Sequence, residues 1–125
     1  MAGRRRVERL NEQFRRELMD ILQNQVRDPR VGLVTVTHVE VTPDLYHAKV
    51  YVTAIDPSTR ESTLEGLDIA EPFIRGEIGR RLHIRRAPEL HFVWDDTLEH
   101  ARRIEQLLGE AMREMGPAEA DDEEA

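Results

Sequence analysis

The feature that most constrains the fold is a pair of alternating apolar segments separated by a turn. Residues 31–41 (VGLVTVTHVEV) place β-branched side chains at alternate positions, which is typical of a pleated strand. Thr42-Pro43-Asp44 follows, and proline is favoured at the second position of a β-turn. Residues 45–54 (LYHAKVYVTA) then read as the returning strand. Together these segments predict a β-hairpin.

An amphipathic helix is predicted before the hairpin, over residues 5–25. Its apolar side chains recur at three- and four-residue steps, the spacing of one helix face. Asp28-Pro29 ends this unit, because the residue before a proline avoids helical backbone angles. The apolar positions are Val7, Leu10, Phe14, Leu18 and Ile21.

A second helical pattern follows the hairpin and is interrupted by Pro72. A proline inside a helix removes a hydrogen bond and costs about 3 kcal/mol, but it costs little in the first turn of a new helix. We therefore predict two helices, over residues 59–70 and 72–82, joined by a sharp kink at Ala70-Glu71-Pro72.

A third strand is predicted over residues 89–94, where Leu90, Phe92 and Trp94 share one face. Thr97 is the expected cap of a last helix that stops at Gly116-Pro117. Its apolar side consists of Leu98, Ile104, Leu107, Leu108 and Met112.

The order of these elements is helix–strand–strand–helix–helix–strand–helix. This order predicts an α+β fold in which one small sheet carries helices on one face. Residues 1–115 are expected to form one domain, and residues 116–125 an acidic, disordered tail.

Composition narrows the function. The chain has 125 residues and no cysteine, which excludes disulfides and thiolate zinc sites. It contains no apolar run long enough to span a bilayer, so a soluble cytoplasmic protein is expected. The net charge is -7, but the acidic tail supplies most of that excess.

Positive charge is concentrated between residues 75 and 86. Five arginines lie there against a single acid, Glu77, and a second basic run stands near the start of the chain. The guanidinium fork matches phosphate oxygens, so an anionic partner is predicted, with nucleic acid as the leading candidate. A solvated helix face is the ordinary alternative. The candidate RNA-binding residues are Arg75, Arg80, Arg81, Arg85, Arg86, Arg4, Arg5 and Arg6.

Catalytic and metal chemistry have weaker support. Asp95-Asp96 could serve a metal-dependent nuclease, but acids before a helix are ordinarily explained by the helix dipole. The five histidines are scattered, and none has metal-ligand spacing, so no metal or cofactor is predicted.

Gly76-Glu77-Ile78-Gly79 is a literal GxxG, the backbone clamp of K-homology domains. Helical spacing of the apolar residues continues straight through it, which favours ordinary helix positions over a clamp. A general single-stranded RNA or DNA reader, which would need the clamp, remains the alternative.

The chain also resembles the ribosome-binding factor A family from about residue 5 to residue 112. The resemblance is carried by segments that occur in the family's order and spacing, each of which is unspecific alone. They are Asp28-Pro29-Arg30-Val31-Gly32, Val34-Thr35-Val36-Thr37, Asp44-Leu45, Ala48-Lys49-Val50-Tyr51-Val52, Phe73-Ile74-Arg75, Arg86-Ala87-Pro88-Glu89-Leu90 and Phe92.

This resemblance implies a type II K-homology fold with a small three-stranded mixed sheet, and a helix–kink–helix in place of the GxxG loop. It implies a non-catalytic, monomeric assembly factor that binds the immature small (30S) ribosomal subunit and its 16S rRNA during late maturation and pre-rRNA processing. The family's kink carries Ala-x-Gly. Here Ala70 matches and Pro72 stands in place of the glycine.

Overall fold

The computed structural model describes residues 2–31 and 33–115, with side chains from Arg5 onward. These residues belong to two compact units, Met1–Asp95 and a second that begins at Asp96. The domain boundary predicted near residue 115 adjoins residues 116–125, which lie outside the described part, and it stays a prediction together with the acidic tail.

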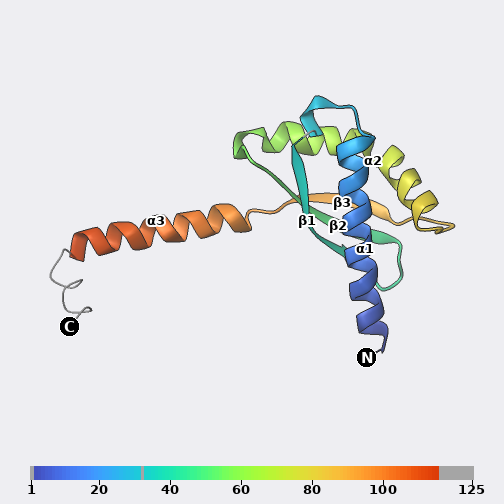
Figure 1. The fold of residues 1–125 in the computed structure, drawn as a ribbon, viewed down its shortest axis with the longest axis horizontal. Helices are drawn as coiled ribbons and strands as arrows, with labels where there is room; N and C mark the ends of the chain where they lie inside the picture. The colour runs from blue at the N-terminus through green and yellow to red at the C-terminus, as the bar shows by residue number, and fades with distance from the viewer. Residues whose placement is uncertain (1, 32, 116–125) are drawn as a thin grey trace. The chain divides into compact units, whose positions relative to one another are not determined.

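The first unit contains a three-stranded mixed sheet, shown in Figure 1. Strands β1 (Val34–Val41) and β2 (His47–Ala54) pair antiparallel, which confirms the predicted hairpin. Strand β3 (Glu89–Trp94) pairs parallel with β2, so β2 is central and the sheet order is β1-β2-β3. The first strand starts later than predicted, because Pro29–Val31 form a short 3-10 helix, η1.

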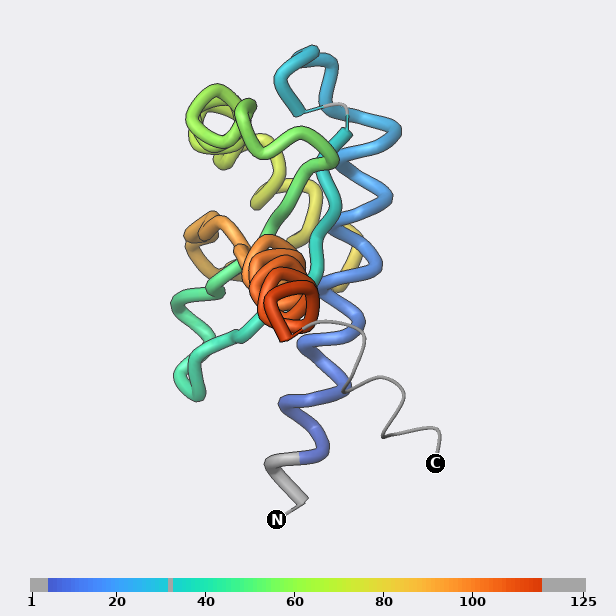
Figure 2. Tube along the Cα trace, turned by 90° about the vertical axis from the view of Figure 1, so that its left-hand side faces the viewer, coloured from blue at the N-terminus to red at the C-terminus, as the bar shows by residue number. Residues whose placement is uncertain are grey.

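Two helices cover one face of this sheet. Helix α1 (Ala2–Asn24) lies alongside β1, as Figure 2 shows, and α2 (Arg60–Arg81) contacts both β3 and α1. A second short 3-10 helix, η2 (Pro57–Thr59), precedes α2. The inward side chains of both layers form a single core, and the opposite face of the sheet carries polar residues. The α+β fold with helices on one face is therefore confirmed.

A β-bulge at Thr37 keeps this core continuous along β1. The register passes from Val36 opposite Val52 to His38 opposite Tyr51, which leaves Thr37 as the extra residue. Buried positions in β1 therefore switch phase between Val36 and Val39. Without the bulge, the second half of β1 would turn its valines to the open face.

The prediction of two separate helices around Pro72 is wrong. One continuous helix, α2, spans the whole segment with Pro72 inside it, although Figure 1 shows that its axis changes direction along the way. The proline ring forces such a bend, because it lacks an N–H and collides with the preceding turn. Leu67 and Ile74 are fully buried on either side of Pro72, and this burial offsets the cost of the proline.

Helix α2 ends in a Schellman motif. The Ile84 amide donates to the Gly79 carbonyl at 2.9 Å, and the His83 amide donates to the Arg80 carbonyl at 3.4 Å. His83 takes the left-handed conformation that the motif requires, with φ of 54°. The chain therefore turns sharply after α2, and residues 82–88 return it to β3.

Both edges of the sheet are bonded to helix side chains. On β1 the Val41 amide donates to Asn11 Oδ1 of α1 at 2.9 Å, and on β3 the Leu90 amide donates to Glu71 Oε2 of α2 at 2.8 Å. The Glu71 side chain is only 13% exposed. The middle residue of the predicted kink is thus tied directly to β3.

The second unit is described by itself. Helix α3 (Thr97–Met115) begins at the residue predicted to cap it, and the His100 amide donates to the carbonyl of Asp96 at 2.9 Å. The predicted apolar side exists but is exposed at every position: Leu98, Ile104, Leu107, Leu108 and Met112. Within the described residues, none of the helices is long and apolar enough to cross a membrane.

Candidate nucleic-acid interface

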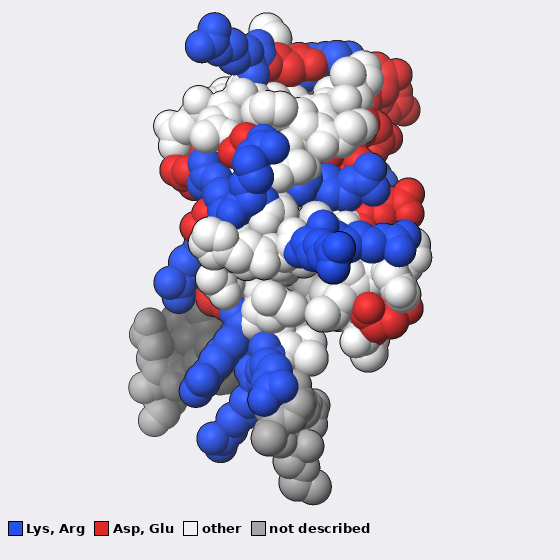
Figure 3. Space-filling view, turned by 90° about the vertical axis from the view of Figure 1, so that its right-hand side faces the viewer, with Lys and Arg blue, Asp and Glu red and all other residues white. Residues whose placement is uncertain are grey.

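The predicted arginines lie at the C-terminal part of α2 and in the segment that follows it. Arg75, Arg80 and Arg81 belong to α2, whereas Arg85 and Arg86 belong to residues 82–88. Figure 3 shows the side of the molecule that is on the right in Figure 1. Positive side chains lie across its middle, and again at the end where α1 begins. The structure thus brings the cluster to one surface, but its members differ in what they contact.

Arg81 is tied to the fold. Its guanidinium donates to Asp20 at 2.5 Å and to Glu17 at 3.2 Å, both on α1, and its side chain is only 21% exposed. The hydrogen bond from Arg81 lowers the pKa of the Asp20 carboxyl, and the same bond raises the pKa of Arg81. Arg81 therefore joins α2 to α1, and its predicted contact with RNA stays a prediction with little free charge behind it.

Arg80 is exposed and pairs with Glu77 one turn earlier in α2. Its guanidinium can exchange that partner for a phosphate, because the pair lies at the surface, where such ion pairs contribute little.

Arg85 and Arg86 are the cations with the least compensation. Both are exposed, and neither lies within ion-pair distance of a carboxylate among the residues that the structure describes. The guanidinium carbon of Arg86 lies 4.8 Å from the centre of the Tyr46 ring, in cation–π geometry. This contact holds Arg86 in place without neutralising its charge.

Arg86 and Tyr46 form part of a surface hollow of about 260 Å³. The hollow joins the start of β2, the middle of α2 and the segment before β3. Arg75 contributes a second guanidinium, whose one ion pair among the described residues is a long contact of 3.9 Å to Glu71. The residues that line this hollow are Tyr46, His47, Arg75, Arg86, Ala87 and Glu89.

This hollow combines two cations with a half-exposed aromatic ring, since Tyr46 is 51% exposed. Sequence reasoning missed Tyr46, because an aromatic residue just before a strand gives no sign of which arginine it will meet. Leu45, immediately before it, has φ of 64°, and this left-handed residue ends the turn that presents Tyr46. Such a conformation in a leucine is uncommon and marks the turn as a constrained one.

The second basic segment lies at the start of α1. Arg5 and Arg6 are exposed and make no ion pair with any carboxylate in the described residues. The side chain of Arg4, the third member of this predicted anchor, lies outside the described part of the chain.

The glycines of the literal GxxG lie inside α2, as predicted. A Cβ built on Gly76 would meet only the end of the Arg80 side chain, at 3.8 Å, whereas one on Gly79 would lie 3.4 Å from the Ile84 carbonyl. Both distances allow ordinary van der Waals contact, so neither position requires glycine for lack of space. Neither glycine belongs to a loop between two helices, which is where a K-homology clamp would need them.

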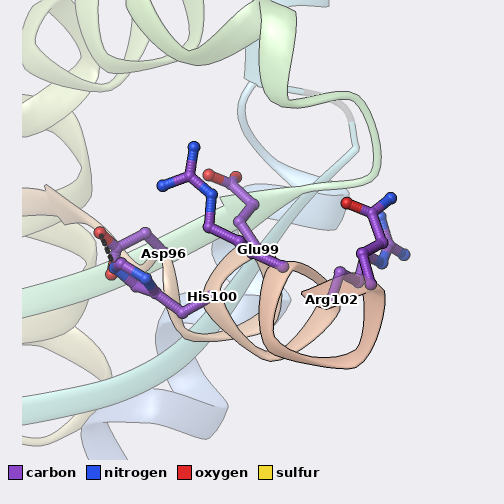
Figure 4. A pocket seen from close by; sticks show the side chains of 6 residues that line it. Asp96, Glu99, His100 and Arg102 are labelled. Carbon is purple, nitrogen blue, oxygen red and sulfur yellow. Dashed lines mark hydrogen bonds and ion pairs between the residues drawn. The ribbon is translucent and has the colours of Figure 1, made fainter. Parts of the chain in front are cut away.

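The two acids of the nuclease hypothesis have ordinary partners. Asp95 accepts a hydrogen bond from the Thr37 hydroxyl at 2.5 Å. Asp96 contacts His100 at 3.2 Å at the start of α3, beside a hollow whose lining side chains in Figure 4 all come from that helical segment. The described contacts give neither acid the converging carboxylates that a metal-dependent nuclease uses.

A family model and a curated relative both match this chain over most of its length. The family model described as Ribosome-binding factor A matches residues 6–108. A curated ribosome-binding factor A from Chromobacterium violaceum is 43% identical over 112 residues, which cover 90% of this chain and 81% of that protein.

Solved structures agree with this comparison. The crystal structure of ribosome-binding factor A from Thermus thermophilus matches with a TM-score of 0.65 and 33% identity, over 70% of this chain and 93% of that one. A Thermus thermophilus homology model fitted into the cryo-EM map of a 30S complex matches with a TM-score of 0.59 and 33% identity, over 68% of this chain and 90% of that one. The K-homology-like α+β fold is shared with these structures.

Proposed function

This chain belongs to the ribosome-binding factor A family, and from that premise we propose that it binds the immature small ribosomal subunit on its 16S rRNA. It acts as a monomeric cytoplasmic factor in late maturation and pre-rRNA processing. The support is the match to a relative fitted into a map of its 30S complex, together with a surface suited to phosphate.

The proposed contacts with RNA are centred on Arg75, Arg85 and Arg86. Arg75 and Arg86 line the hollow beside Tyr46, and Arg85 is next to Arg86 in the segment of residues 82–88. An RNA backbone that crosses the hollow meets charge-assisted donors, and a base can stack on the exposed part of the Tyr46 ring. This arrangement is the observation that carries the proposal.

Arg5 and Arg6 supply a second anchor at the start of α1, with Arg4 next to them in sequence. Arg80 adds a cation at the edge of the first cluster. Two separated basic surfaces suit a large, shaped RNA better than a short single strand, because their arginines contact phosphates and do not read the base sequence.

The bend of α2 orients this surface. Glu71 bonds to β3, and the helix segment after Pro72 carries Arg75 toward the loop that holds Arg86. Pro72 therefore provides the bend in a position where the family's motif has glycine.

The factor works without catalysis, because binding alone accounts for its charged surface. A general single-stranded RNA reader is the second candidate. It is favoured by the GxxG letters in the sequence and disfavoured by the helical position of both glycines.

Co-sedimentation with purified small subunits at several salt concentrations tests the proposal. We expect the double variant Arg85→Ala/Arg86→Ala to weaken binding by about tenfold or more, and to reduce the slope of log affinity against log salt by about two. The matched control is Arg102→Ala/Arg103→Ala, which removes the same charge from exposed positions on α3. Equal affinities for the wild type and the first variant would overturn the assignment.

A further inference from the structure

Three potential metal ligands meet on the open face of the sheet, far apart in the sequence. The parallel pairing of β2 with β3 sets His47 opposite Glu89 and Lys49 opposite His91. As a result His47, Glu89 and His91 lie together, and all three are exposed. Sequence spacing hides this group, because His47 and His91 belong to strands that are joined only through α2.

The donor atoms are already close to ligand spacing. His47 Nδ1 lies 3.0 Å from His91 Nε2 and 3.6 Å from Glu89 Oε2, and all three donors lie within 4.8 Å of one another. Two donors bound to one tetrahedral zinc ion at about 2.0–2.1 Å lie about 3.3 Å apart. The two separations from His47 bracket this value, and an ion would replace the hydrogen bond that joins His47 Nδ1 to His91 Nε2.

We propose that His47, Glu89 and His91 form a binding site for a divalent transition-metal ion, with zinc as its best representative. Two imidazoles and one carboxylate are the donors of open zinc sites, whereas magnesium and calcium prefer oxygen ligands alone. Three protein ligands leave a coordination position for water. The site shares its hollow with Arg75 and Arg86, but none of its three ligands is an arginine proposed to contact RNA.

The surroundings limit the affinity. Lys49 lies opposite His91 in the strand pairing, and Arg75 and Arg86 line the hollow that also contains His47 and Glu89. Asp44, whose carboxyl pKa is lowered chiefly by a hydrogen bond from Thr42, is a further acid near His47. Lys49, Arg75 and Arg86 repel a divalent ion, so we expect binding weaker than that of structural zinc sites. The ion must also displace protons from the two histidines, so its affinity falls as the pH is lowered.

Titration of the metal-free full chain with zinc chloride tests the site, by calorimetry at pH 7.5 and at pH 5.5. We expect one site per chain at pH 7.5, a loss of at least tenfold in affinity at pH 5.5, and a comparable loss in His91→Ala and in Glu89→Gln. His38→Ala is the matched control, since His38 lies on the same sheet and, among the described residues, contacts one acid, Glu40, at 3.3 Å. Its affinity should equal that of the wild type.

Imidazole nitrogen resonances of the wild type give a second measurement that needs no variant. Zinc should shift the resonances of His47 Nδ1 and His91 Nε2 and leave those of His38 and His100 unchanged. Equal binding by wild type and His91→Ala, uniform shifts of all histidines, or an affinity weaker than about 1 mM would each overturn the proposal.

Discussion

The variant Gly76→Ala tests whether Gly76 is an ordinary helix position or part of a phosphate clamp. Gly76 lies inside α2 and is exposed, and an added Cβ would meet only the flexible end of Arg80, at 3.8 Å. Glycine is about 0.8–1.0 kcal/mol less favourable than alanine inside a helix. With no collision to offset this gain, the variant should be about 1 kcal/mol more stable than the wild type.

That gain corresponds to a rise in Tm of about 4–8 °C for a unit of this size. Urea and thermal denaturation measure it, and co-sedimentation with small subunits measures the proposed function of the same protein. We expect unchanged affinity, because the helix reading gives Gly76 no contact with RNA. A true clamp requires the backbone to approach the phosphate closely, and there the added methyl group would greatly weaken binding.

Gly66→Ala is the internal comparison, since Gly66 lies in the same helix but is buried. Its Cβ would lie 3.0 Å from Val31 Cγ2 and 3.2 Å from the Arg30 Cβ, so η1 would have to move. Overpacking of this kind costs about 1–3 kcal/mol, which exceeds the gain in helix propensity. A less stable Gly76→Ala, or one that folds but no longer co-sediments, would refute the reasoning.

Three further predictions concern single contacts. Arg81→Ala should lose about 1–2 kcal/mol in urea denaturation at neutral pH, whereas Arg80→Ala stays near wild type. Because the Arg81 hydrogen bond lowers the folded-state pKa of Asp20, its stabilisation exists above the unfolded pKa and disappears as the pH falls through the folded pKa. The Arg81→Ala deficit should therefore shrink in acid, and a pH-independent deficit would contradict this. Glu71→Ala should lose about 1–3 kcal/mol by stranding a β3 amide, and Glu71→Gln, which keeps an acceptor, should lose less. His83→Gly should raise Tm by relieving about 1 kcal/mol of left-handed strain, and a lower Tm would contradict that reading.

The hydrophobic period predicted which segments form helices and strands because that information is local. The hairpin, α1, the alternation of β3 and the helical position of Gly76 and Gly79 all follow from it. The bulge at Thr37 does not follow from it. The need for a bulge arises only in the folded sheet, where the valines before and after Thr37 must face the same core.

The polar contacts of the candidate interface were beyond local reasoning. Arg81 counted as an uncompensated cation, but the two acids that accept its hydrogen bonds lie on α1, 61 and 64 positions away along the chain. Tyr46 and Arg86 are far apart in the sequence, and the parallel pairing of β2 with β3 brings their segments together. The prediction of two helices failed for a related reason, because a local rule for proline cannot weigh the burial of Leu67 and Ile74 on both sides.

The side chains bonded to the sheet edges bear on how the protein behaves at high concentration. An open three-stranded sheet has two outer strands, and free amides there can recruit strands from other copies and start aggregation. Asn11 of α1 and Glu71 of α2 each occupy one such amide. The two helices thus reduce, on both outer strands, the backbone groups that could pair with a strand of another copy.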